Sequence, residues 1–516
     1  MTDSPRSRSP HGDAPAPGDL MLRLTGEITT KGRRTRSRFQ RRLADNLRDA
    51  LRAAGTPGLV RADWSRVFVR ADSAATDVLS RVFGVSTYSP LEAECDAVLE
   101  EIVRTGSRVF GERVKGRRFA VRARRAGKHG FSSQDVMREL GAAIGTGATV
   151  DLSSPEVEVC VDIRDERALL YSERLQGAGG LPLGTEGKAV CLLSGGFDSA
   201  VAAWMMLRRG VALDYVFCNL GGEAYQRMVL EVAEVLARDW SYGYSPTLFS
   251  LDFEPAVEEV RRVFRPQFQQ LGLKRQMYRA ASEIGLRVGA HAVITGEAVG
   301  QVSSQTLASL RAIDDASRLP VLRPLVGMDK EEIISRSRAV GTCELSGRVR
   351  EYCSISSGRP ATAASKDAVL RDDQGLSPEI LDTAVDGARL FDLRSLDMSR
   401  IAGESVFVTD VPNGALVFDT RAPEAFLDWH WSGSRNREYP ALLATYRELS
   451  REATYLLYCE HGLKSARLAE LMQRAGFEAY SLMGGVKALR KLSCRTDPEG
   501  EPAATRGDSQ GDGGRR

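Results

Sequence analysis

A short apolar run, a glycine-rich turn and an apolar helix follow one another in residues 189–210, and they strongly constrain the fold. The run at 189–193 has the length and composition of a buried parallel strand. The turn SGGFDS comes next, and the helix after it ends in RRG at 208–210, an ordinary helix ending. Backbone N–H groups at such a helix start bind anions, and glycines let the anion approach. The stretch therefore predicts a phosphate site, and a structural turn that happens to hold two glycines is the alternative.

Strands and helices keep alternating after this turn. Apolar runs at 212–220, 246–253 and 291–295 predict three further buried strands, and MVLEVAEVLARDW predicts an amphipathic helix between the first two. This alternation predicts a doubly wound parallel sheet, whose ligands bind at the carboxyl ends of the strands. The loops after Leu193 and Thr295 both start at such ends, so we expect them to contribute to ligand binding.

Length and composition limit the class of protein. A chain of 516 residues should hold about three or four domains. Its eight cysteines are scattered without a CxxC pair, which argues against a zinc site and against a secreted disulfide framework. No run of eighteen apolar residues and no signal peptide is found. We therefore expect a soluble, cytoplasmic protein without a membrane partner.

Two basic runs lie in the first third of the chain, although the net charge is only +3. Seven cations fall within residues 31–42 and eight within 113–128. One charge run is usually a solvated face, but two with few acids nearby favour contact with a phosphate backbone. His129 could reach RNA or form a local hydrogen bond, and the sequence leaves both open. The candidate RNA contacts are Lys31, Arg33, Arg34, Arg124, Arg125 and Lys128.

Three stretches resemble known families. SGGFDS resembles the PP-loop of ATP pyrophosphatases, which cleave ATP between its α and β phosphates, and it is not a Walker A loop. FAVRARRAGKHGFSSQDVMRELGAAI resembles the THUMP domain, an RNA-binding module of tRNA-modifying enzymes. GEITTKG resembles the small ferredoxin-like domain that precedes THUMP in one such family. Together these resemblances imply that the chain binds both ATP and RNA.

The region after residue 400 resembles a rhodanese domain. ALVFDTRAPEAF places Asp419 and Arg421 after a strand, and Cys459 heads the loop CEHGLKS between a strand and a helix. The N–H groups of such a loop and the following helix start stabilise a thiolate or persulfide. Family loops often carry Arg directly after the cysteine, whereas this loop has Glu460. Its carboxylate disfavours the thiolate, while Lys464 and the loop amides favour it.

The order of these domains resembles the ThiI family of tRNA 4-thiouridine synthetases. The matching segments are GEITTKG, the THUMP segment, LLSGGFDS, NLGG, LKRQMYRAA, ITGEAVGQVSSQT, LRPLVGMDKEEI and EYC. The resemblance covers almost all of residues 21–353, and a rhodanese domain follows in the longer members of the family. It implies sulfur transfer to a uridine of tRNA, with ATP activating the uracil O4.

The fold implied by the resemblance is multidomain, α+β and α/β. A ferredoxin-like and THUMP N-terminal region precedes a doubly wound parallel-sheet PP-loop domain and an α/β rhodanese domain. The composition of both chain ends predicts disorder. The expected bounds are a tail at 1–20, the ferredoxin-like domain at 21–75, THUMP at 76–176, the PP-loop domain at 185–365, a linker at 366–399, the rhodanese domain at 400–494 and a tail at 495–516.

The resemblance also assigns the nucleotide site. Asp198 would act in adenylation through Mg²⁺, and Lys330 would stabilise the charge that develops on phosphate. For Lys274 and Lys330, the residues alone favour a surface salt bridge. The implied ATP contacts are Leu192, Leu193, Ser194, Gly195, Gly196, Ser199, Lys274, Gly296 and Gln305.

A pair of cysteines completes the chemistry that the resemblance implies. A cysteine desulfurase would pass sulfur to Cys459, and the persulfide, or sulfide released from it, would attack the adenylated uridine. Cys353 would then attack Cys459 and form a disulfide, which a cellular thiol or a ferredoxin-type reductant reopens. The long linker would let the two cysteines meet. Cys343 is the rival for this role, and a packing role for Cys353 is the simpler alternative.

Other functions are compatible with parts of the sequence. The chain could serve only as a sulfur carrier for the thiazole of thiamine, which needs the rhodanese domain alone. It could be an RNA-binding protein with a decayed catalytic centre, against which the intact Asp198 and Cys459 argue. It could thiolate C2 of uracil or a cytidine, but those PP-loop enzymes lack the pairing of THUMP with GEITTKG. The oligomeric state is open, a homodimer included.

Overall fold

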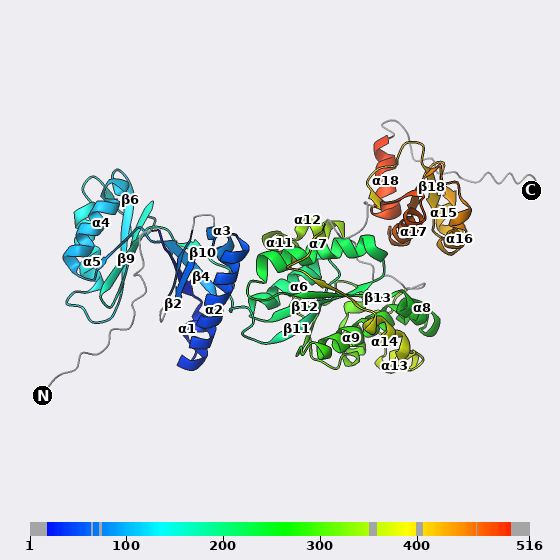
Figure 1. Cartoon of the computed structure of the whole chain (residues 1–516), viewed down its shortest axis with the longest axis horizontal. Helices are drawn as coiled ribbons and strands as arrows, with labels where there is room; N and C mark the ends of the chain where they lie inside the picture. The colour runs from blue at the N-terminus through cyan, green and yellow to red at the C-terminus, as the bar shows by residue number, and fades with distance from the viewer. Residues whose placement is uncertain are drawn as a thin grey trace, which may run out of the picture.

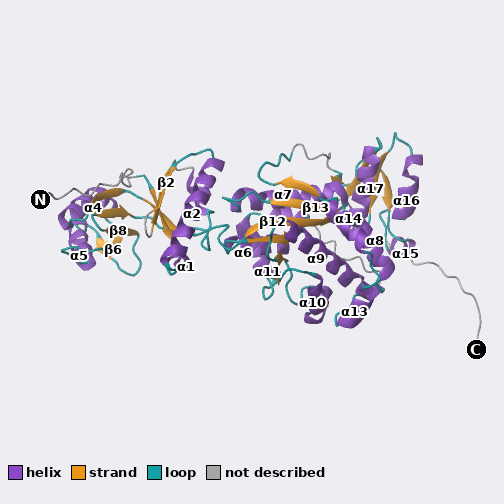
Figure 2. Cartoon of the chain, turned by 60° about the horizontal axis from the view of Figure 1, so that its bottom comes forward, coloured by secondary structure: helices purple, strands orange, loops and turns teal. Residues whose placement is uncertain are grey.

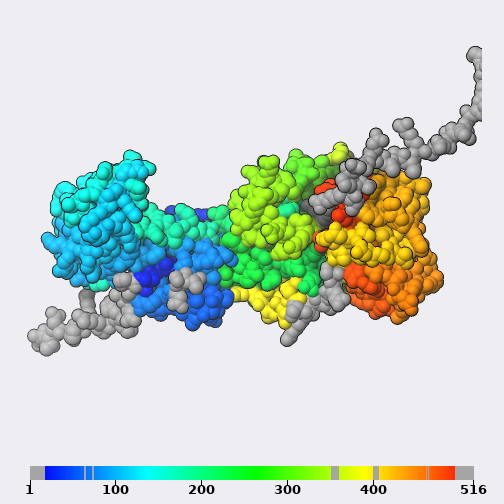
Figure 3. Space-filling model, turned by 90° about the horizontal axis from the view of Figure 1, so that it is seen from above, coloured from blue at the N-terminus to red at the C-terminus, as the bar shows by residue number. Residues whose placement is uncertain are grey.

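The computed structural model describes residues 18–62, 66–71, 75–349, 359–398, 406–460 and 462–496. These residues form four β-sheets, and each sheet is the centre of one domain. The domains lie in a row along the long axis of an elongated molecule (Figure 1 and Figure 3). The second domain of the sequence is at one end of the row and the fourth at the other. No helix in the described part of the chain is long and apolar enough to cross a membrane.

The first domain is an antiparallel sheet covered by helices on one face. Its elements are β1 (Leu20–Leu24), α1 (Gly26–Thr29), α2 (Arg33–Ala53), β2 (Leu59–Ala62), β3 (Arg66–Arg70), α3 (Ala75–Ser80), β4 (Val85–Pro90) and β10 (Leu175–Gln176). The strand order is β10-β4-β1-β3-β2. α2 buries Phe39, Leu43 and Leu47, which recur at helical spacing, against the sheet.

The second domain carries two helices on one face of a mixed sheet. Its elements are β5 (Ala93–Asp96), α4 (Leu99–Val114), β6 (Arg118–Ala126), α5 (Ser133–Ile144), β7 (Thr149–Val150), β8 (Val157–Arg164) and β9 (Arg167–Tyr171). The strand order is β5-β9-β8-β6-β7, and β8 and β9 form an antiparallel hairpin. Ser132 and Asp135 form a capping box that starts α5.

The first two domains are interleaved in sequence, so their boundary differs from the one expected at residue 76. β4 pairs with β1, and β10 pairs with β4, which places both strands in the first sheet. The second domain is therefore inserted between β4 and β10. An apolar cluster that includes Met21, Phe68 and Leu169 joins the two sheets. Local sequence patterns do not reveal this boundary because it depends on long-range strand pairing.

The third domain is the expected doubly wound sheet, with helices on both faces (Figure 2). Its first elements are β11 (Lys188–Leu192), α6 (Phe197–Arg208), β12 (Ala212–Asn219), α7 (Gly222–Trp240), β13 (Thr247–Asp252), α8 (Glu254–Val263), η1 (Pro266–Phe268), α9 (Gln269–Arg287) and β14 (Val293–Ile294). They are followed by η2 (Ser303–Gln305), α10 (Leu307–Ile313), η3 (Asp314–Ala316), β15 (Val321–Leu322), α11 (Lys330–Val340), α12 (Cys343–Arg348), α13 (Lys366–Asp373), α14 (Pro378–Asp386) and β16 (Arg389–Asp392). The order is β15-β14-β11-β12-β13-β16, and only β13 and β16 pair antiparallel.

Most of the expected linker at 366–399 is folded onto this third domain. β16 pairs with the edge strand β13, and Val369 of α13 and Val385 of α14 are buried in the same core as α8 and α9. The carboxylate of Asp373 accepts a hydrogen bond from Arg275 of α9 at 3.0 Å. The polar, alanine-rich composition suggests a linker, but these few buried contacts are enough to fold the segment.

An aromatic cluster joins the first and third domains. Phe83 stacks on Trp240 with a centroid distance of 5.5 Å and lies edge-on to Trp204 at 6.0 Å. Beside this cluster, Arg42 on α2 donates hydrogen bonds of 2.7 Å to the carbonyls of Leu183 and Gly243. Because the junction is both apolar and hydrogen-bonded, we expect these two domains to move as one body.

The fourth domain is a parallel sheet between two layers of helices. Its elements are β17 (Phe407–Val408), β18 (Leu416–Asp419), α15 (Pro423–Asp428), β19 (Arg435–Asn436), α16 (Tyr439–Thr445), η4 (Tyr446–Glu448), β20 (Thr454–Tyr458), α17 (Leu463–Arg474), β21 (Glu478–Leu482) and α18 (Gly485–Thr496). The order is β17-β21-β20-β18-β19. α16 and α17 pack on one face and α18 on the other. The expected start of this domain at residue 400 lies outside the described residues.

We expect Phe83→Ala to weaken the junction between the first and third domains. Truncating a buried aromatic ring leaves a cavity and costs about 3–5 kcal/mol of the free energy of unfolding. Thermal unfolding and the fluorescence of Trp204 and Trp240 measure this loss. Leu427→Ala is the control, because that side chain is 80% exposed. A Phe83→Ala protein as stable as the control would contradict the packing described.

Candidate active site

A pocket opens at the carboxyl edge of the third sheet, where the strand order reverses. The chain builds β12 and β13 on one side of β11 and then crosses to β14 on the other side. Doubly wound sheets bind their ligands at such a switch point. The pocket has a volume of ≈ 350 Å³, which suits a small-molecule site. The expected site residues that line it are Leu192, Ser194, Asp198, Ser199, Lys274, Gly296 and Gln305.

Serine hydroxyls hold the turn between β11 and α6. Ser199 Oγ accepts a hydrogen bond from Ser194 N–H at 3.2 Å and donates one to Gly196 O at 3.1 Å. Gly195 has a φ of +79°, which side chains other than glycine rarely adopt. Gly196 is the N-cap of α6 and has no side chain with which to cap the helix. The N–H groups of the first helical turn can therefore serve an anion.

The loop after β14 approaches this turn so closely that only glycine fits at position 296. A Cβ atom there would lie 2.6 Å from Asp198 C and 2.6 Å from Ser199 N. Because both neighbours are backbone atoms of α6, neither can move aside alone. Gly296 thus lets the loop after β14 pack against the turn between β11 and α6. This structural role is separate from the nucleotide contact that the family resemblance implies.

Asp198 lies in the first turn of α6 and is held by groups from two other segments. Its carboxylate accepts hydrogen bonds from Lys330 Nζ at 2.8 and 3.0 Å and from Gln301 Nε2 at 3.1 Å. Lys330 is the first residue of α11 and its side chain is 42% exposed. It does form a salt bridge, but with the candidate catalytic carboxylate rather than with an unrelated surface acid.

A second carboxylate is buried in the wall of the pocket. Glu297 accepts from Lys274 Nζ at 2.6 Å and from Arg323 Nε at 2.9 Å, and the Tyr278 hydroxyl donates to it. Burial alone raises the pKa of Glu297, but the Lys274 cation and these hydrogen bonds outweigh it and lower the pKa to about 2. Glu297 is therefore ionised at neutral pH and fixes the ammonium group of Lys274 in place.

Two polar atoms at the pocket lack a partner. Ser304 Oγ and Gln305 Oε1 are buried and have no hydrogen-bond partner among the described residues, and both residues line the pocket. Buried polar atoms are nearly always paired in proteins, so these two mark positions for a ligand or water. Gln305 Oε1 can only accept, which requires a donor such as an amino group.

Some expected nucleotide contacts lie behind the surface of the pocket. Leu193 packs in the core, and its N–H donates to Val216 O at 3.0 Å, so that amide is already used within the sheet. Gly195 and Gly196 are buried and shape the turn. Lys330 does not line the pocket itself but donates a hydrogen bond to Asp198, which does.

Cys353 falls within residues 350–358, outside the described residues. The residues that flank this segment both lie at the site. Val349 Cγ1 is 3.3 Å from where a Cβ of Gly195 would be, and Pro360 lines the pocket. The rival Cys343 begins α12 and is partly buried.

Glu297, Tyr278 and Arg323 also belong to the site, although none of them was predicted from the sequence. Glu297 comes two residues after the predicted strand at 291–295, and a charged residue so near a strand end is a recognisable signal for a ligand loop. Tyr278 and Arg323 carried no such signal, because their contacts with Glu297 come from distant parts of the chain.

The fourth domain presents Cys459 at the carboxyl end of β20. Its Sγ accepts hydrogen bonds from Gly462 N–H at 3.1 Å and from Ser465 Oγ at 3.4 Å. Gly462, with a φ of +87°, is the N-cap of α17. These donors and the helix start favour negative charge on sulfur. The loop can therefore hold a thiolate or a persulfide.

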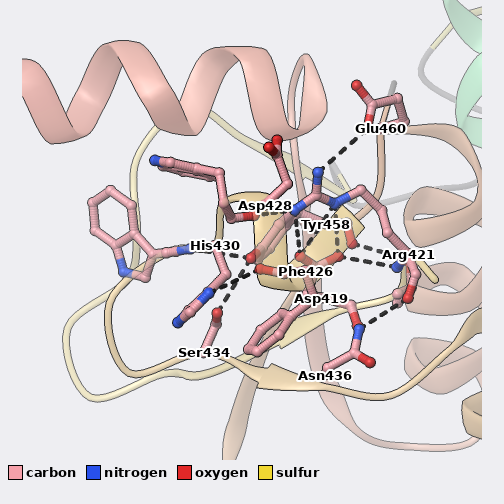
Figure 4. Close-up of polar contacts among 12 residues, drawn as sticks. Asp419, Arg421, Phe426, Asp428, His430, Ser434, Asn436, Tyr458 and Glu460 are labelled. Atoms are coloured by element: carbon pink, nitrogen blue, oxygen red, sulfur yellow. Dashed lines mark hydrogen bonds and ion pairs between the residues drawn. The ribbon is translucent and has the colours of Figure 1, made fainter. Parts of the chain in front are cut away.

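The carboxylate of Glu460 pairs with Arg421 (Figure 4). Arg421 Nη1 lies 3.4 Å from Glu460 Oε2, while Arg421 Nη2 donates to the buried carboxylate of Asp419 at 2.7 Å. Arg421 also donates to Trp429 O at 2.5 Å. Arg421 thus contacts Glu460, the residue that departs from the usual family loop, but shares its charge with the closer carboxylate of Asp419.

Several other cysteines are core residues. Burial raises the pKa of the thiols of Cys95, Cys160 and Cys191. Cys160 also lies in the apolar cluster between the first and second sheets. These thiols are packed in the core, whereas Cys459 Sγ accepts hydrogen bonds from Gly462 and Ser465.

The candidate RNA contacts lie near the ends of elements in the first two domains. Two of them begin α2, two lie near the end of β6 and one lies in the loop after β6, and all five are exposed. The sixth, Lys31, is partly buried, and its Nζ lies 4.8 Å from the ring centroid of Phe39. These exposed cations are Arg33, Arg34, Arg124, Arg125 and Lys128.

His129 makes local contacts. Its Nε2 lies 2.5 Å from Asp165 O, and Arg125 Nη1 lies 3.3 Å from its Nδ1. Since the arginine can only donate, Nδ1 accepts and the proton sits on Nε2. Of the two possibilities for His129, the local hydrogen bond is thus present.

Comparison with known proteins identifies the family. Domain models match in the expected order: "ThiI ferredoxin-like domain" at 20–89, "THUMP domain" at 96–173, "Thiamine biosynthesis protein (ThiI)" at 184–377 and "Rhodanese-like domain" at 409–492. A tRNA sulfurtransferase of Pyrobaculum aerophilum is 38% identical over 469 residues, 90% of this chain and 96% of that protein. The chain belongs to the tRNA sulfurtransferase family. The resemblance to ThiI and the expected fold classes are confirmed.

Further relatives extend the comparison. The tRNA sulfurtransferase of Proteus mirabilis is 34% identical over 491 residues, 92% of this chain and 99% of that protein. Among solved structures, "a 4-thiouridine synthetase - RNA complex with bound ATP" is similar with a TM-score of 0.63 and 30% identity, over 72% of this chain and 98% of that chain. A protein from Pyrococcus horikoshii gives 0.51 and 28%, over 63% and 99%.

We expect Glu297→Gln to destabilise the third domain and to change its response to acid. At neutral pH the substitution leaves the buried Lys274 cation without its counter-charge, which costs about 3–5 kcal/mol. In the wild type the lowered pKa of Glu297 stabilises the fold above its ordinary pKa of 4.5, and this contribution is lost as pH falls toward 2. The difference in melting temperature between the wild type and Glu297→Gln should therefore become smaller as the pH is lowered from 7 to 3. A constant difference would contradict the ion pair.

Proposed function

We propose that this chain uses ATP to activate O4 of a uridine in tRNA and replaces that oxygen with sulfur carried by Cys459, giving 4-thiouridine. The proposal rests on one observation: the third domain has a pocket that suits a nucleotide, and the fourth domain has a loop that can stabilise a thiolate. The similarity to a 4-thiouridine synthetase crystallised with RNA and ATP supports it. The proposed substrate, tRNA, places the activity in the cytoplasm.

The first step is adenylation. A carbonyl oxygen of uracil is a poor leaving group, and its attack on the α-phosphate of ATP converts it into AMP while pyrophosphate leaves. The N–H groups of α6, Lys274 and Lys330 offer positive charge for the phosphates and for the charge that develops on them. Gln305 Oε1 offers an acceptor for an amino group such as that of adenine.

Asp198 suits a role next to Mg²⁺. Magnesium in nucleotide enzymes uses one or two carboxylates together with phosphate oxygens. No group of three or more His, Cys, Asp or Glu in the described ranges could hold a metal without nucleotide. Asp198 and the phosphates would therefore hold Mg²⁺, which would neutralise phosphate charge.

The second step is sulfur transfer. A cysteine desulfurase loads Cys459 as a persulfide, whose terminal sulfur attacks C4 of the activated uridine and expels AMP. The thiolate of Cys353 then attacks Cys459 Sγ, which releases 4-thiouridine and leaves a disulfide between the two cysteines. A cellular thiol or a ferredoxin-type protein supplies the two electrons that reopen this disulfide. The position of Val349 and Pro360 beside the PP-loop supports the choice of Cys353.

The first two domains bind the tRNA in this proposal. Exposed Lys and Arg side chains grip phosphates and recognise shape rather than sequence. A second role, sulfur supply for the thiazole of thiamine, is favoured by the "Thiamine biosynthesis protein (ThiI)" match. That role would need Cys459 but not the nucleotide pocket, so growth without thiamine would survive loss of Asp198.

Nucleoside analysis of tRNA tests the main proposal. Cells without the protein should lack 4-thiouridine. In purified reactions Asp198→Asn should reduce 4-thiouridine formation by about 10²-fold or more with any sulfur source, because it removes charge from the adenylation site. Cys459→Ser should block the reaction with desulfurase and cysteine but retain activity with sodium sulfide. Normal 4-thiouridine in the deletion strain would refute the proposal.

We expect Arg124→Glu and Lys128→Glu to weaken tRNA binding and to reduce its salt dependence. Each lost phosphate contact lowers the slope of log K against log salt by about one. Arg138→Glu is the matched control, since its guanidinium already pairs with Asp135 at 3.0 Å. Filter binding at several salt concentrations measures both effects. Equal slopes for all three variants would exclude this surface.

A further inference from the structure

The fourth domain docks on the carboxyl edge of the third sheet, at the ends of β12 and β13. α17, which begins directly after the Cys459 loop, packs against α7. One face of α17 lines a crevice with the first turn of α7 and the end of β13, through Arg467, Glu470 and Arg474. These residues are three and four positions apart and therefore share one helix face.

The central contact is a carboxylate at a helix start. α7 begins after Gly221, which offers no side-chain cap. Glu470 Oε2 instead accepts a hydrogen bond of 2.9 Å from the backbone N–H of Glu223 in the first turn of α7. Glu470 is only 8% exposed. A residue of the fourth domain thus supplies the capping acceptor that the third domain lacks, and its negative charge suits the positive end of the helix.

Two ion pairs flank this cap. Arg474 lies 2.7 Å from the carboxylate of Glu223, and Arg467 lies 3.0 Å from the carboxylate of Glu254 at the start of α8. A Cβ atom on Gly222 would lie 2.7 Å from Glu470 Oε2, so glycine permits the close approach. The contacts are charged, directional and partly exposed, which is typical of an interface that forms and opens.

Docking places the start of α17, which follows the Cys459 loop, beside α8. The pKa of Lys464, in the first turn of α17, is lowered by partial desolvation and by Arg261 of α8, while Cys459 and Glu254 oppose the shift. The carbonyl of Arg261 in turn accepts from Gln269 at the start of α9, where the next residue, Gln270, lines the pocket. α8 therefore contacts both the docked helix α17 and the helix α9, which lines the pocket.

We propose that Glu470 is a positioning residue, which docks the fourth domain through the start of α7 so that Cys459 can deliver sulfur to the activated uridine. This inference rests on the proposed function. Docking is intramolecular, because only residues 393–406 separate β16 from β17, and a short tether gives a high effective concentration. Weak polar contacts are then enough to hold the delivery state and still let it open.

Single-turnover assays that separate the steps test this role. Glu470→Lys places a cation at the start of α7 and beside Arg467 and Arg474, so 4-thiouridine formation from desulfurase-loaded protein should slow at least tenfold. Persulfide loading of Cys459, and 4-thiouridine formation from ATP and sodium sulfide, should stay within twofold of wild type because neither needs docking. Glu470→Gln keeps the acceptor and should lie between the two. Arg447→Glu, on an exposed part of the same domain, should behave as wild type.

A charge swap gives a second, independent measurement. Arg467→Glu alone should slow delivery several-fold, and adding Glu254→Arg should restore it. Delivery by Glu470→Lys as fast as or faster than wild type would overturn the inference, since the docked state would then be dispensable or inhibitory. If Glu470→Lys also loses loading or sulfide-driven activity, the swap decides, and failure to restore overturns the inference. A wild type inactive even with sulfide would instead refute the proposed function itself.

Discussion

The structure depends on two helix N-termini, those of α6 and α7, which lie at the carboxyl edge of the same parallel sheet and can each bind a negatively charged group. α6 and α7 follow the neighbouring strands β11 and β12, and each begins at a glycine that offers no cap. The start of α6 faces the nucleotide pocket, and the start of α7 takes the carboxylate of Glu470 from another domain. Because both helix starts favour negative charge, one edge can receive a phosphate and a docked domain side by side.

The two carboxylates at the pocket differ in how permanently they are paired. Glu297 is buried among Lys274, Arg323 and Tyr278, so separating these groups would leave uncompensated charge in the protein interior. Asp198 pairs with Lys330 at a rim where the lysine is 42% exposed. Solvent weakens such a pair, so a phosphate can compete for the lysine at little cost. The first cluster is thus a fixed wall, and the second pair is free to exchange partners.

Local patterns predicted the parts of the structure that depend on neighbours in sequence. The strand and turn before Asp198, the apolar spacing along α2 and the loop at Cys459 each carry their signal within about twenty residues. The pairing of β4 and β10, the folding of residues 366–393 and the cluster around Glu297 depend on partners far away along the chain. For residues 366–393 the composition predicts a linker, but a few buried contacts are enough to fold the segment.

The row of domains separates the proposed tRNA-binding domain from the domain that carries Cys459. The second domain and the fourth lie at opposite ends of the molecule, with the nucleotide pocket between them (Figure 1). The stacking of Phe83 on Trp240 fixes the first domain relative to the third, so the fold would set the distance from the proposed tRNA contacts to the pocket. The polar contacts of Glu470 hold the other end more loosely. In the proposed reaction, selection of the uridine would therefore depend on a rigid junction, and sulfur delivery on one that opens.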